Sequence, residues 1–447
     1  MMNTPICDFV RAYAASGMTR LHMPGHKGAP VLGVESLDIT EIAGADSLYE
    51  AEGIIAESEQ NAGGLFGADT FYSTEGSSQC IRAMLYLAVL HARGQGITHP
   101  TVVAGRNAHK TFLSAVALLD LDVTWLYPKA EDSYLSCAIT APMLERLLEH
   151  GEKPTAVYLT SPDYLGNTVD IAAIAEVCHR YGVLLLVDNA HGAYLKFLSP
   201  SRHPMDLGAD ICCDSAHKTL PVLTGGAYLH ISRNAPMELA AQAKRALAMF
   251  GSTSPSYLIL QSLDAANRVL AGGYGEELTV LSERVADCRA RLEAHGYVCA
   301  GDEPIKLTIC PKSYGYTGTA LAQYLREQGI ECEFADPDYL VLMFTPATTE
   351  ADLSRLTDAL LALPRRESIT AQPPAMGRPE RVMSVRDAAL SPCETVPAAK
   401  SVGRILAAAT VGCPPAVPIV VSGERIDESA AAQFAYYGME SCVVVKK

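Results

Sequence analysis

The stretch TAVYLTSPDYLGNTVDIAAIAEVCHRYGVLLLVD (155–188) decides the fold. It begins and ends with apolar runs, 155–162 and 183–188, which have the length of buried strands. Apolar residues between the two runs recur with the helical period: Ile171, Ile174, Ala175 and Cys178. Asp170 stands where a helix N-cap is expected, and Gly182 stands where the helix should end. The pattern predicts a β-α-β unit, which is the building block of a parallel sheet.

The same alternation extends on both sides of this unit. Residues 77–94 predict a helix, and three further segments predict strands: 101–105, 209–215 and 226–232. After about residue 275, a second series of helices and strands predicts a smaller α/β layer: 277–296, 305–310, 320–329 and 339–344. We expect five parts in chain order: an N-terminal arm (1–45), a large domain (46–275), a small α/β domain (276–363), a linker (364–382) and a C-terminal module (383–447).

The composition excludes several classes of protein. The 447 residues are 49 % hydrophobic and 19 % charged, which is typical of a folded globular chain rather than a disordered one. A net charge of −15 is unfavourable for binding nucleic acid, which requires clustered Lys and Arg. No apolar run approaches the ~20 residues of a membrane span. The thirteen cysteines follow no zinc or disulfide spacing. We therefore expect a cytoplasmic protein with no membrane or nucleic-acid partner.

Four short motifs carry polar residues that could do chemistry: STEGSSQ (73–79), GRNAHKT (105–111), VDNAHG (187–192) and DSAHKTLPVLTGG (214–226). Each has an ordinary explanation when it is taken alone. The serines would cap a helix, His109 would cap a helix or face solvent, and Lys218 would be a solvated surface amine. Asp188 and His191 are residue types that bind metals, but the sequence offers no convincing third ligand nearby. We therefore expect no metal ion.

Taken together, the four motifs indicate pyridoxal phosphate. A Gly-Ser-Ser turn (76–78) before a helix would bind a phosphate dianion. Lys218, shortly after a strand, would bond to the aldehyde carbon of the cofactor. Asp188, at the carboxyl end of a strand, would keep the ring nitrogen protonated, so that the ring can accept electrons. A flat histidine could cover one face of the ring, and the small residue Ala190 leaves room on the other.

The sequence resembles the Orn/Lys/Arg decarboxylase family of fold-type I pyridoxal-phosphate enzymes. Beyond the four motifs, the matching stretches are LHMPGHKG (21–28), DSLYEAEGIIAESEQNAGGLFGAD (46–69), LTSPDYLG (159–166), STSPSY (252–257) and PPAVPIVVSGE (414–424). Its length resembles that of the compact, biosynthetic-type members. The resemblance implies an α/β fold: an aminotransferase-like large domain with a mainly parallel sheet, a smaller α/β domain and a short C-terminal module. It also implies decarboxylation of arginine, lysine or ornithine to CO2 and a polyamine-type amine.

The resemblance assigns roles to individual residues. Lys218 would hold the cofactor, Asp188 would pair with its ring nitrogen, and His109 would stack on the ring. His191 would lie near the ring hydroxyl or the substrate carboxylate. The residues expected around the phosphate are Gly76, Ser77, Ser78, Ser215 and His217.

Subunit contacts and substrate choice rest on other positions. Thr253 and Ser254 lie in a segment that resembles one reaching the partner subunit's site, so we expect a homodimer or larger homo-oligomer with shared active sites. Glu424 follows an apolar strand; we expect it either to face the active-site entrance and bind the basic end of the substrate, or to be a solvated turn residue. The chain departs from the family at Glu75 and Asn189, where Asn and Glu are common. A carboxylate at Glu75 would have to point away from a phosphate.

Three other functions fit parts of this pattern. They are an aminotransferase or Cβ-lyase of the same fold, a catalytically silent homologue, and a metal-dependent hydrolase. Release of an amine and CO2 without a keto acid would identify the decarboxylase, and the intact Lys218, Asp188 and His109 argue against a silent homologue. No local motif separates arginine from lysine or ornithine. If Glu424 does not bind the substrate side chain, the next candidates are Glu331, Glu333 and Glu75.

Overall fold

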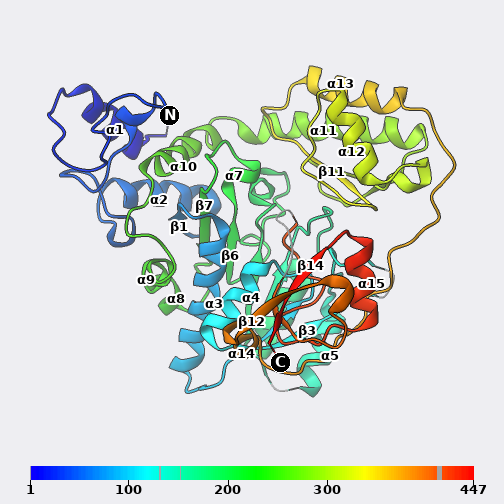
Figure 1. Ribbon diagram of the computed structural model, residues 1–447. Helices are drawn as coiled ribbons and strands as arrows, with labels where there is room; N and C mark the ends of the chain where they lie inside the picture. The colour runs from blue at the N-terminus through cyan, green and yellow to red at the C-terminus, as the bar shows by residue number, and fades with distance from the viewer. Residues whose placement is uncertain (1, 130–131, 152, 410–414, 447) are drawn as a thin grey trace. The chain divides into compact units, whose positions relative to one another are not determined.

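The computed structural model describes residues 2–129, 132–151, 153–409 and 415–446, which form two compact units (Figure 1). The first unit consists of Met1–Pro100, Leu144–Leu159 and Asp170–Glu276. The second consists of Thr101–Met143, Thr160–Val169 and Glu277–Lys447. Each unit is described by itself below.

The first unit is built on adjacent strands in the order β1-β7-β6-β5-β4. These strands are β1 (Asp69–Ser73), β4 (Ala156–Thr160), β5 (Leu184–Asp188), β6 (Ile211–Asp214) and β7 (Ala227–Ile231). Its helices are α1 (Pro5–Ala15), α2 (Ile54–Phe66), α3 (Gly76–Gly94), α5 (Ala141–His150), α6 (Ile171–Tyr181), α7 (Ala216–Thr219), α8 (Met237–Ala241), α9 (Ala243–Ala248) and α10 (Tyr257–Leu270). Helix α3 packs against β6 and β7, and α2 packs against β1 and α10.

The β-α-β unit that opens the sequence argument is present as β4, α6 and β5. The Asp170 side chain accepts a hydrogen bond from the backbone N–H of Ala173 at 3.0 Å, so it caps α6 as predicted. Gly182 ends the helix with φ +62°, a left-handed conformation that glycine adopts without a steric penalty. Every residue of β5 is buried, which agrees with its continuous apolar sequence.

The prediction of an α/β fold with a mainly parallel central sheet is confirmed, although one edge of the first unit is antiparallel. Strands β5 and β6 are parallel, whereas β7 runs antiparallel to both β6 and β1. The reason is the short connection between β6 and β7. It contains only the four-residue helix α7, whereas the crossover to a parallel strand usually contains a longer helix that packs on the sheet.

The second unit contains three groups of strands. Strands β2 (Thr101–Gly105) and β3 (Asp122–Leu126) are parallel, with α4 (Lys110–Leu119) between them in the chain. An antiparallel sheet has the order β10-β11-β9-β8, formed by β8 (Cys299–Ala300), β9 (Lys306–Ile309), β10 (Phe334–Ala335) and β11 (Leu340–Met343). The helices near it in sequence are α11 (Tyr274–Ala294), α12 (Gly318–Glu327) and α13 (Glu350–Ala362).

The C-terminal part of the second unit is a small antiparallel sheet in the order β12-β14-β13. It comprises β12 (Cys393–Pro397), β13 (Leu406–Ala408), β14 (Ser441–Val445), α14 (Val385–Leu390) and α15 (Glu428–Tyr436). Residues 364–380 contain neither helix nor strand. Two hydrogen bonds fix the start of this segment. Tyr314 Oη donates to the Leu363 carbonyl at 3.0 Å, and Tyr316 Oη donates to the Pro364 carbonyl at 2.7 Å.

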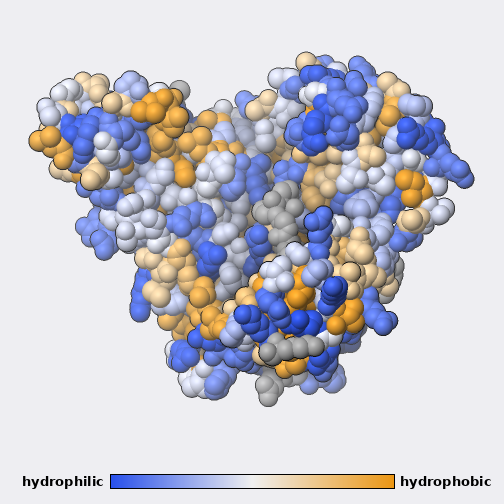
Figure 2. All heavy atoms as spheres, in the orientation of Figure 1, coloured by the Kyte–Doolittle hydropathy of each residue, from blue (hydrophilic) through white to orange (hydrophobic). Residues whose placement is uncertain are grey.

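Exposed apolar side chains gather in the N-terminal segment of the first unit. Leu21, Val31 and Leu32 are 88 %, 81 % and 85 % exposed, and Met18 and Met23 are also exposed. Figure 2 shows orange surface over this segment, which is the blue end of the ribbon in Figure 1. No helix among the described residues is both long and apolar enough to cross a bilayer.

Candidate active site

The candidate site lies in the first unit, where β5 and β6 end at the same edge. The two strands are parallel and Asp188 pairs with Cys213, so Asp188 and Asp214, which end the two strands, are close neighbours. His191 follows β5 by three residues, and Lys218 follows β6 by four. Ligands of parallel sheets bind beyond the carboxyl ends of the strands, which is where these side chains lie.

Asp188 is a buried carboxylate held by uncharged donors. Its side chain is 2 % exposed. Tyr158 Oη donates to Oδ2 at 2.9 Å, and Oδ1 accepts the backbone N–H of Ala190 at 3.2 Å and the thiol of Cys213 at 3.7 Å. Burial raises the pKa of Asp188, while the Tyr158 hydrogen bond and the charge of Lys218 act in the opposite direction. A buried carboxylate of this kind favours a nearby cation.

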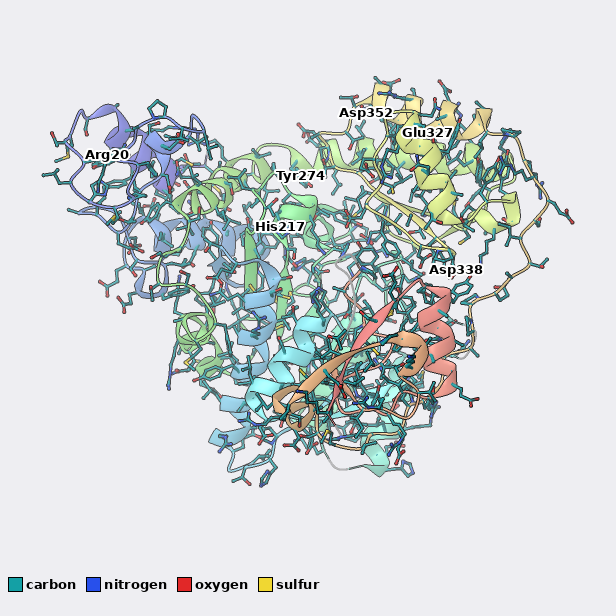
Figure 3. The ribbon with its side chains drawn as sticks, viewed as in Figure 1. Arg20, His217, Tyr274, Glu327, Asp338 and Asp352 are labelled. Atoms are coloured by element: carbon teal, nitrogen blue, oxygen red, sulfur yellow. The ribbon has the colours of Figure 1, made fainter. Side chains whose placement is uncertain are left out.

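Lys218 and His191 are in direct contact. Lys218 Nζ lies 2.8 Å from His191 Nε2, a distance at which one nitrogen donates a proton to the other. His191 is buried and Lys218 is half-buried. Lys218 lies on α7, and the end of this helix is fixed by Tyr274, whose Oη donates to the Thr219 carbonyl at 3.0 Å (Figure 3). The pair therefore combines a nucleophilic amine with a proton acceptor.

The predicted phosphate turn lies at the start of α3. Gly76 has φ +70°, and its N–H donates to the Gly225 carbonyl at 2.7 Å, which joins this turn to the loop after α7. Ser215 Oγ donates to Ser77 Oγ at 2.7 Å. Ser78 is the third residue of the same 19-residue helix, whose N-terminus attracts anions. The turn, Ser77 and Ser215 thus come together as expected.

Two residues beside this turn have their polar groups engaged with backbone. His217 Nδ1 lies 3.0 Å from the Gly226 carbonyl, and burial lowers the pKa of this histidine, so it is neutral and donates from Nδ1 (Figure 3). The Glu75 carboxylate accepts the backbone N–H of Ser252. This contact directs Glu75 toward residues 252–257 rather than toward the first N–H groups of α3.

Thr253 and Ser254 lie on an exposed loop between α9 and α10. Both side chains are exposed, and the Ser254 N–H donates to Ser252 Oγ at 3.1 Å. Their role in the site of a partner subunit stays a prediction.

His109, in the second unit, caps a helix. Its Nδ1 accepts the Thr111 N–H at 3.1 Å and lies 2.9 Å from Thr111 Oγ1, which fixes the start of α4. These bonds use the edge of the imidazole, whereas stacking on a cofactor would use its face. Stacking by His109 therefore stays a prediction.

Glu424, also in the second unit, is buried rather than solvated. It is 2 % exposed, and its Oε2 accepts Arg106 Nη2 at 2.9 Å and the Val421 N–H at 2.8 Å. Arg106 is 1 % exposed and also donates to the carbonyls of Pro418 and Ile419 at 3.1 and 2.9 Å. Burial raises the pKa of Glu424, and Arg106 opposes this effect. The solvated-turn alternative is wrong, and binding of a substrate cation by Glu424 stays a prediction that competes with this ion pair.

Sequence reasoning missed the partners that hold these groups. Tyr158 and Cys213 bond Asp188, and Arg106 bonds Glu424. Tyr158 could have been found, because a tyrosine in the middle of an apolar parallel strand needs a partner for its hydroxyl. Arg106 is 318 residues from Glu424, and no local signal joins the two.

The residues of the first unit fit pyridoxal phosphate. Asp188 is the observation that tests the fit. Among the described residues, only uncharged groups bond this buried carboxylate, so its charge is available to a protonated ring nitrogen. A lysine amine, a histidine, a helix N-terminus and two serine hydroxyls lie at the same end of the sheet. Together they supply the donors and the nucleophile that an aldehyde and a phosphate would need.

Comparisons with known proteins agree with this chemistry. The profile of the Orn/Lys/Arg decarboxylase major domain matches residues 4–299, and that of the C-terminal domain matches residues 370–443. The chain is 30 % identical to an arginine decarboxylase of Bacillus subtilis, with 95 % of this chain and 91 % of that protein covered. It is 31 % identical to an arginine decarboxylase of Halalkalibacterium halodurans, with 96 % and 92 % covered. A lysine decarboxylase structure from Francisella novicida superposes with a TM-score of 0.79 at 18 % identity, covering 98 % of this chain and 79 % of that one.

Proposed function

The chain belongs to the Orn/Lys/Arg decarboxylase family, and from this premise we propose that it converts L-arginine to agmatine and CO2 with pyridoxal phosphate bound at Lys218. The resemblance inferred from the sequence motifs is confirmed by the family profiles. The protein is a pyridoxal-phosphate-dependent decarboxylase of a basic amino acid. The choice of arginine and the roles of individual residues are the parts that we propose.

Arginine is the proposed substrate because of the relatives that match nearly the whole chain. The matches to the two arginine decarboxylases cover more than 90 % of this chain and more than 90 % of each relative, at 30–31 % identity. A lysine decarboxylase of Pseudomonas aeruginosa is 23 % identical and is covered over 67 % of its length. The guanidinium of arginine and the ammonium of lysine differ in shape and in hydrogen-bond geometry. A comparison of activity on the two amino acids therefore distinguishes an arginine site from a lysine site.

The pairing of buried Asp188 with the Lys218–His191 contact carries the proposed mechanism. Bound pyridoxal phosphate supplies an aldehyde for the amine and a protonated ring that withdraws electrons from the substrate α-carbon. Asp188 would hold the proton on the ring nitrogen through its charge. Lys218 would be the amine that holds the cofactor, and its Nζ lies 2.8 Å from His191 Nε2, close enough for a proton to pass between them. Either of these two groups can then deliver the proton that replaces the lost carboxylate.

The phosphate would be held by the start of α3. Gly76, Ser77 and Ser78 offer N–H groups and hydroxyls. Ser215, the residue before α7, and His217, within α7, lie beside them. We also propose a cytoplasmic homodimer that serves polyamine synthesis. The twelve cysteines that the structure describes are free thiols, as a reducing compartment would keep them.

The test is a product assay with arginine, lysine and ornithine on the protein loaded with pyridoxal phosphate. We expect CO2 and agmatine from arginine in equal amounts, no keto acid, and kcat/KM at least about tenfold lower for the other two amino acids. A keto acid product would favour the aminotransferase alternative. Preference for lysine or ornithine would overturn the choice of arginine.

A second experiment tests Lys218 itself. Borohydride reduction of the loaded protein should fix the cofactor to the peptide that contains Lys218, as read by mass spectrometry. Lys218→Ala should lose this adduct, and Lys312→Ala serves as the control because Lys312 lies in the second unit, where it bonds Asp338. An adduct that survives in Lys218→Ala would show that another lysine holds the cofactor.

A further inference from the structure

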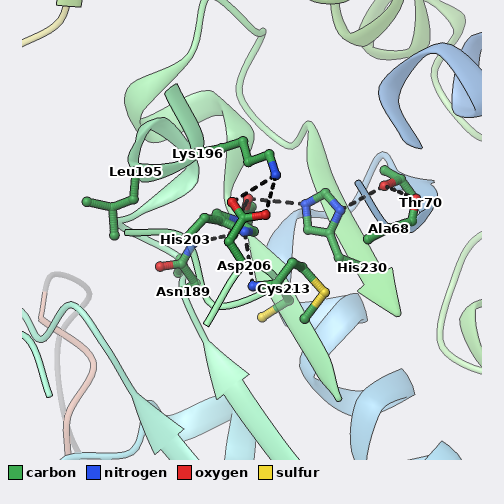
Figure 4. Close-up of polar contacts among 12 residues, drawn as sticks. Ala68, Thr70, Asn189, Leu195, Lys196, His203, Asp206, Cys213 and His230 are labelled. Carbon is green, nitrogen blue, oxygen red and sulfur yellow. Dashed lines mark hydrogen bonds and ion pairs between the residues drawn. The ribbon is translucent and has the colours of Figure 1, made fainter. Parts of the chain in front are cut away.

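A buried anion lies beside the candidate site and takes no part in the chemistry described above. Asp214, at the end of β6, has no exposed surface. Its Oδ1 accepts Asn189 Nδ2 at 2.6 Å, and its Oδ2 lies 3.0 Å from His203 Nε2 and 3.2 Å from His230 Nε2. Asn189 and both histidines are also fully buried. Figure 4 labels Asn189, His203 and His230 of this cluster.

The proton positions in the cluster follow from its outer contacts. The Met205 N–H donates to His203 Nδ1 at 3.3 Å, so it is the other ring nitrogen of His203, Nε2, that carries a proton and donates it to Asp214. His230 Nε2 lies 3.2 Å from the same carboxylate oxygen, which can only accept, so this Nε2 also donates; burial lowers the pKa of His230, and its Nδ1 lies 2.9 Å from Thr70 Oγ1 (Figure 4). Burial acts to raise the pKa of Asp214. The two histidines outweigh the effect of burial and hold the pKa of Asp214 well below the usual range.

These proton positions argue against a metal ion in the cluster. His203, Asp214 and His230 place ligand atoms within 4.8 Å of one another, as a metal site would. A metal bound to His203 Nε2 would require the proton on Nδ1, where it would oppose the Met205 N–H. The cluster is instead a rigid hydrogen-bond acceptor for Asn189, and Phe66 covers it with its ring centroid 4.4 Å from that of His230.

Asn189 is the residue through which this cluster meets the active site. It lies between Asp188 and His191 in the chain, separated from the latter by Ala190. Its N–H donates to the Cys213 carbonyl at 3.0 Å, and its carbonyl accepts the Gly192 N–H at 2.7 Å. A Cβ on Gly192 would lie 2.1 Å from Asn189 Oδ1, so the asparagine side chain fills the space that only glycine leaves open.

We propose that Asn189 is a positioning residue for the decarboxylation, anchoring the turn that carries Asp188 and His191 to Asp214. The two histidines prevent Asp214 from rotating, Asp214 holds the Asn189 amide, and the amide fixes the backbone on both sides. Asp188 and His191 therefore keep their places relative to Lys218. This inference rests on the proposed function, because it concerns the geometry of that reaction.

The test exchanges the two partners. Asn189→Asp places a carboxylate against Asp214, and Asp214→Asn removes the charge that both histidines bond; each should lower kcat by at least about tenfold and change the visible circular dichroism of the bound cofactor. In the double variant Asn189→Asp/Asp214→Asn, the amide introduced at position 214 can donate to the carboxylate introduced at position 189, while its oxygen accepts from both histidines. We expect the double variant to return kcat to within about threefold of wild type, together with the circular dichroism signal.

A matched control separates positioning from stability. Asn267 is another fully buried asparagine of the first unit, and its Nδ2 donates to the Ser58 carbonyl at 3.0 Å. Asn267→Ala should lower the melting temperature and leave the cofactor circular dichroism unchanged. The proposal is overturned if the single variants of Asn189 and Asp214 behave like Asn267→Ala, or if the double variant is no better than either single variant. A wild-type protein that neither binds the cofactor nor releases CO2 would instead overturn the proposed function, and the role of Asn189 with it.

Discussion

Asp188 and Asp214 end neighbouring strands and are both buried, but their surroundings act on them in opposite directions. Among the residues that the structure describes, only uncharged groups bond Asp188, so burial dominates and its pKa is raised. Two histidines bond Asp214, and its pKa is lowered. Asp188 is therefore the carboxylate that gains from an added cation, whereas Asp214 already has its partners.

We predict that Asp188→Asn lowers kcat at least about a hundredfold while the protein stays folded. Asparagine keeps the shape of the side chain but has no charge to hold a proton on the ring nitrogen. Activity and the far-ultraviolet circular dichroism of the same preparation check this prediction. Turnover near that of wild type in a folded variant would contradict the role of Asp188.

The raised pKa of Asp188 should make the stability of the cofactor-free protein depend on pH. The folded pKa of Asp188 is above its unfolded value of ~3.9, so its contribution to stability is lost as pH rises through the folded pKa. We predict that cofactor-free Asp188→Asn melts higher than wild type, by a larger margin at pH 8 than at pH 4. Thermal melts of both proteins at the two pH values measure this margin. An equal margin at both pH values would mean that Asp188 does not titrate in this way.

We predict that Glu424→Gln destabilises the protein by ~3–5 kcal/mol, because it leaves the buried Arg106 without its counter-charge. Urea unfolding measures this loss. Glu394→Gln is the control, since Glu394 bonds Arg404 at 2.6 Å but is 43 % exposed, and its loss should cost no more than ~1 kcal/mol. A rise in KM for arginine without a loss of stability would instead favour Glu424 as a substrate-binding residue.

Helix α6 is fixed at both ends by single residues, and these ends are testable. We predict that Asp170→Ala destabilises the protein by ~1 kcal/mol, because it removes the cap on the Ala173 N–H. Gly182→Ala should cost a similar ~1 kcal/mol, because φ is +62° at this position. Equilibrium unfolding in urea measures both. No change in either variant would mean that strand packing alone holds α6 in place.

The elements around α6 were predictable because their signals are local. Strand β5 is a continuous apolar run, and the cap and the stop of α6 lie within a few residues of its ends. The predicted helix 77–94 is found as α3, and the strand predicted at 101–105 is found as β2. Lys218, His191 and Asp188 were proposed as site residues on the same kind of local signal, since each lies at or shortly after the end of a recognisable strand.

The pairings between elements were not predictable. The antiparallel direction of β7 depends on the short α7 connection, and the sequence between β6 and β7 does not show whether it can cross the sheet. The Tyr158–Asp188 bond spans 30 positions, and the Asn189–Asp214 bond spans 25. Such contacts depend on strand order and register, which hydrophobic pattern alone does not specify.

At the scale of the whole molecule, the N-terminal segment presents apolar surface to solvent. Leu21 and Leu32 are 88 % and 85 % exposed. We predict that Leu21→Asp/Leu32→Asp converts a homodimer to monomers and lowers kcat/KM, because apolar patches of this kind mark contacts between chains. Sedimentation velocity and the activity assay measure the two effects. Met237→Asp is the control, since Met237 is 87 % exposed on α8 and should leave both unchanged. A monomeric wild type would contradict this prediction.

The Arg106–Glu424 ion pair has a consequence for synthesis on the ribosome. At ~5–20 residues per second, Arg106 is made about 15–60 s before Glu424, which is 318 positions later. Until then, the nascent chain has a guanidinium that the finished protein buries, with neither its counter-charge nor the carbonyls of Pro418 and Ile419. Water must solvate this group in the meantime, so the end of β2 cannot close over it. Chains that terminate early would keep this segment open and would be exposed to proteases and chaperones.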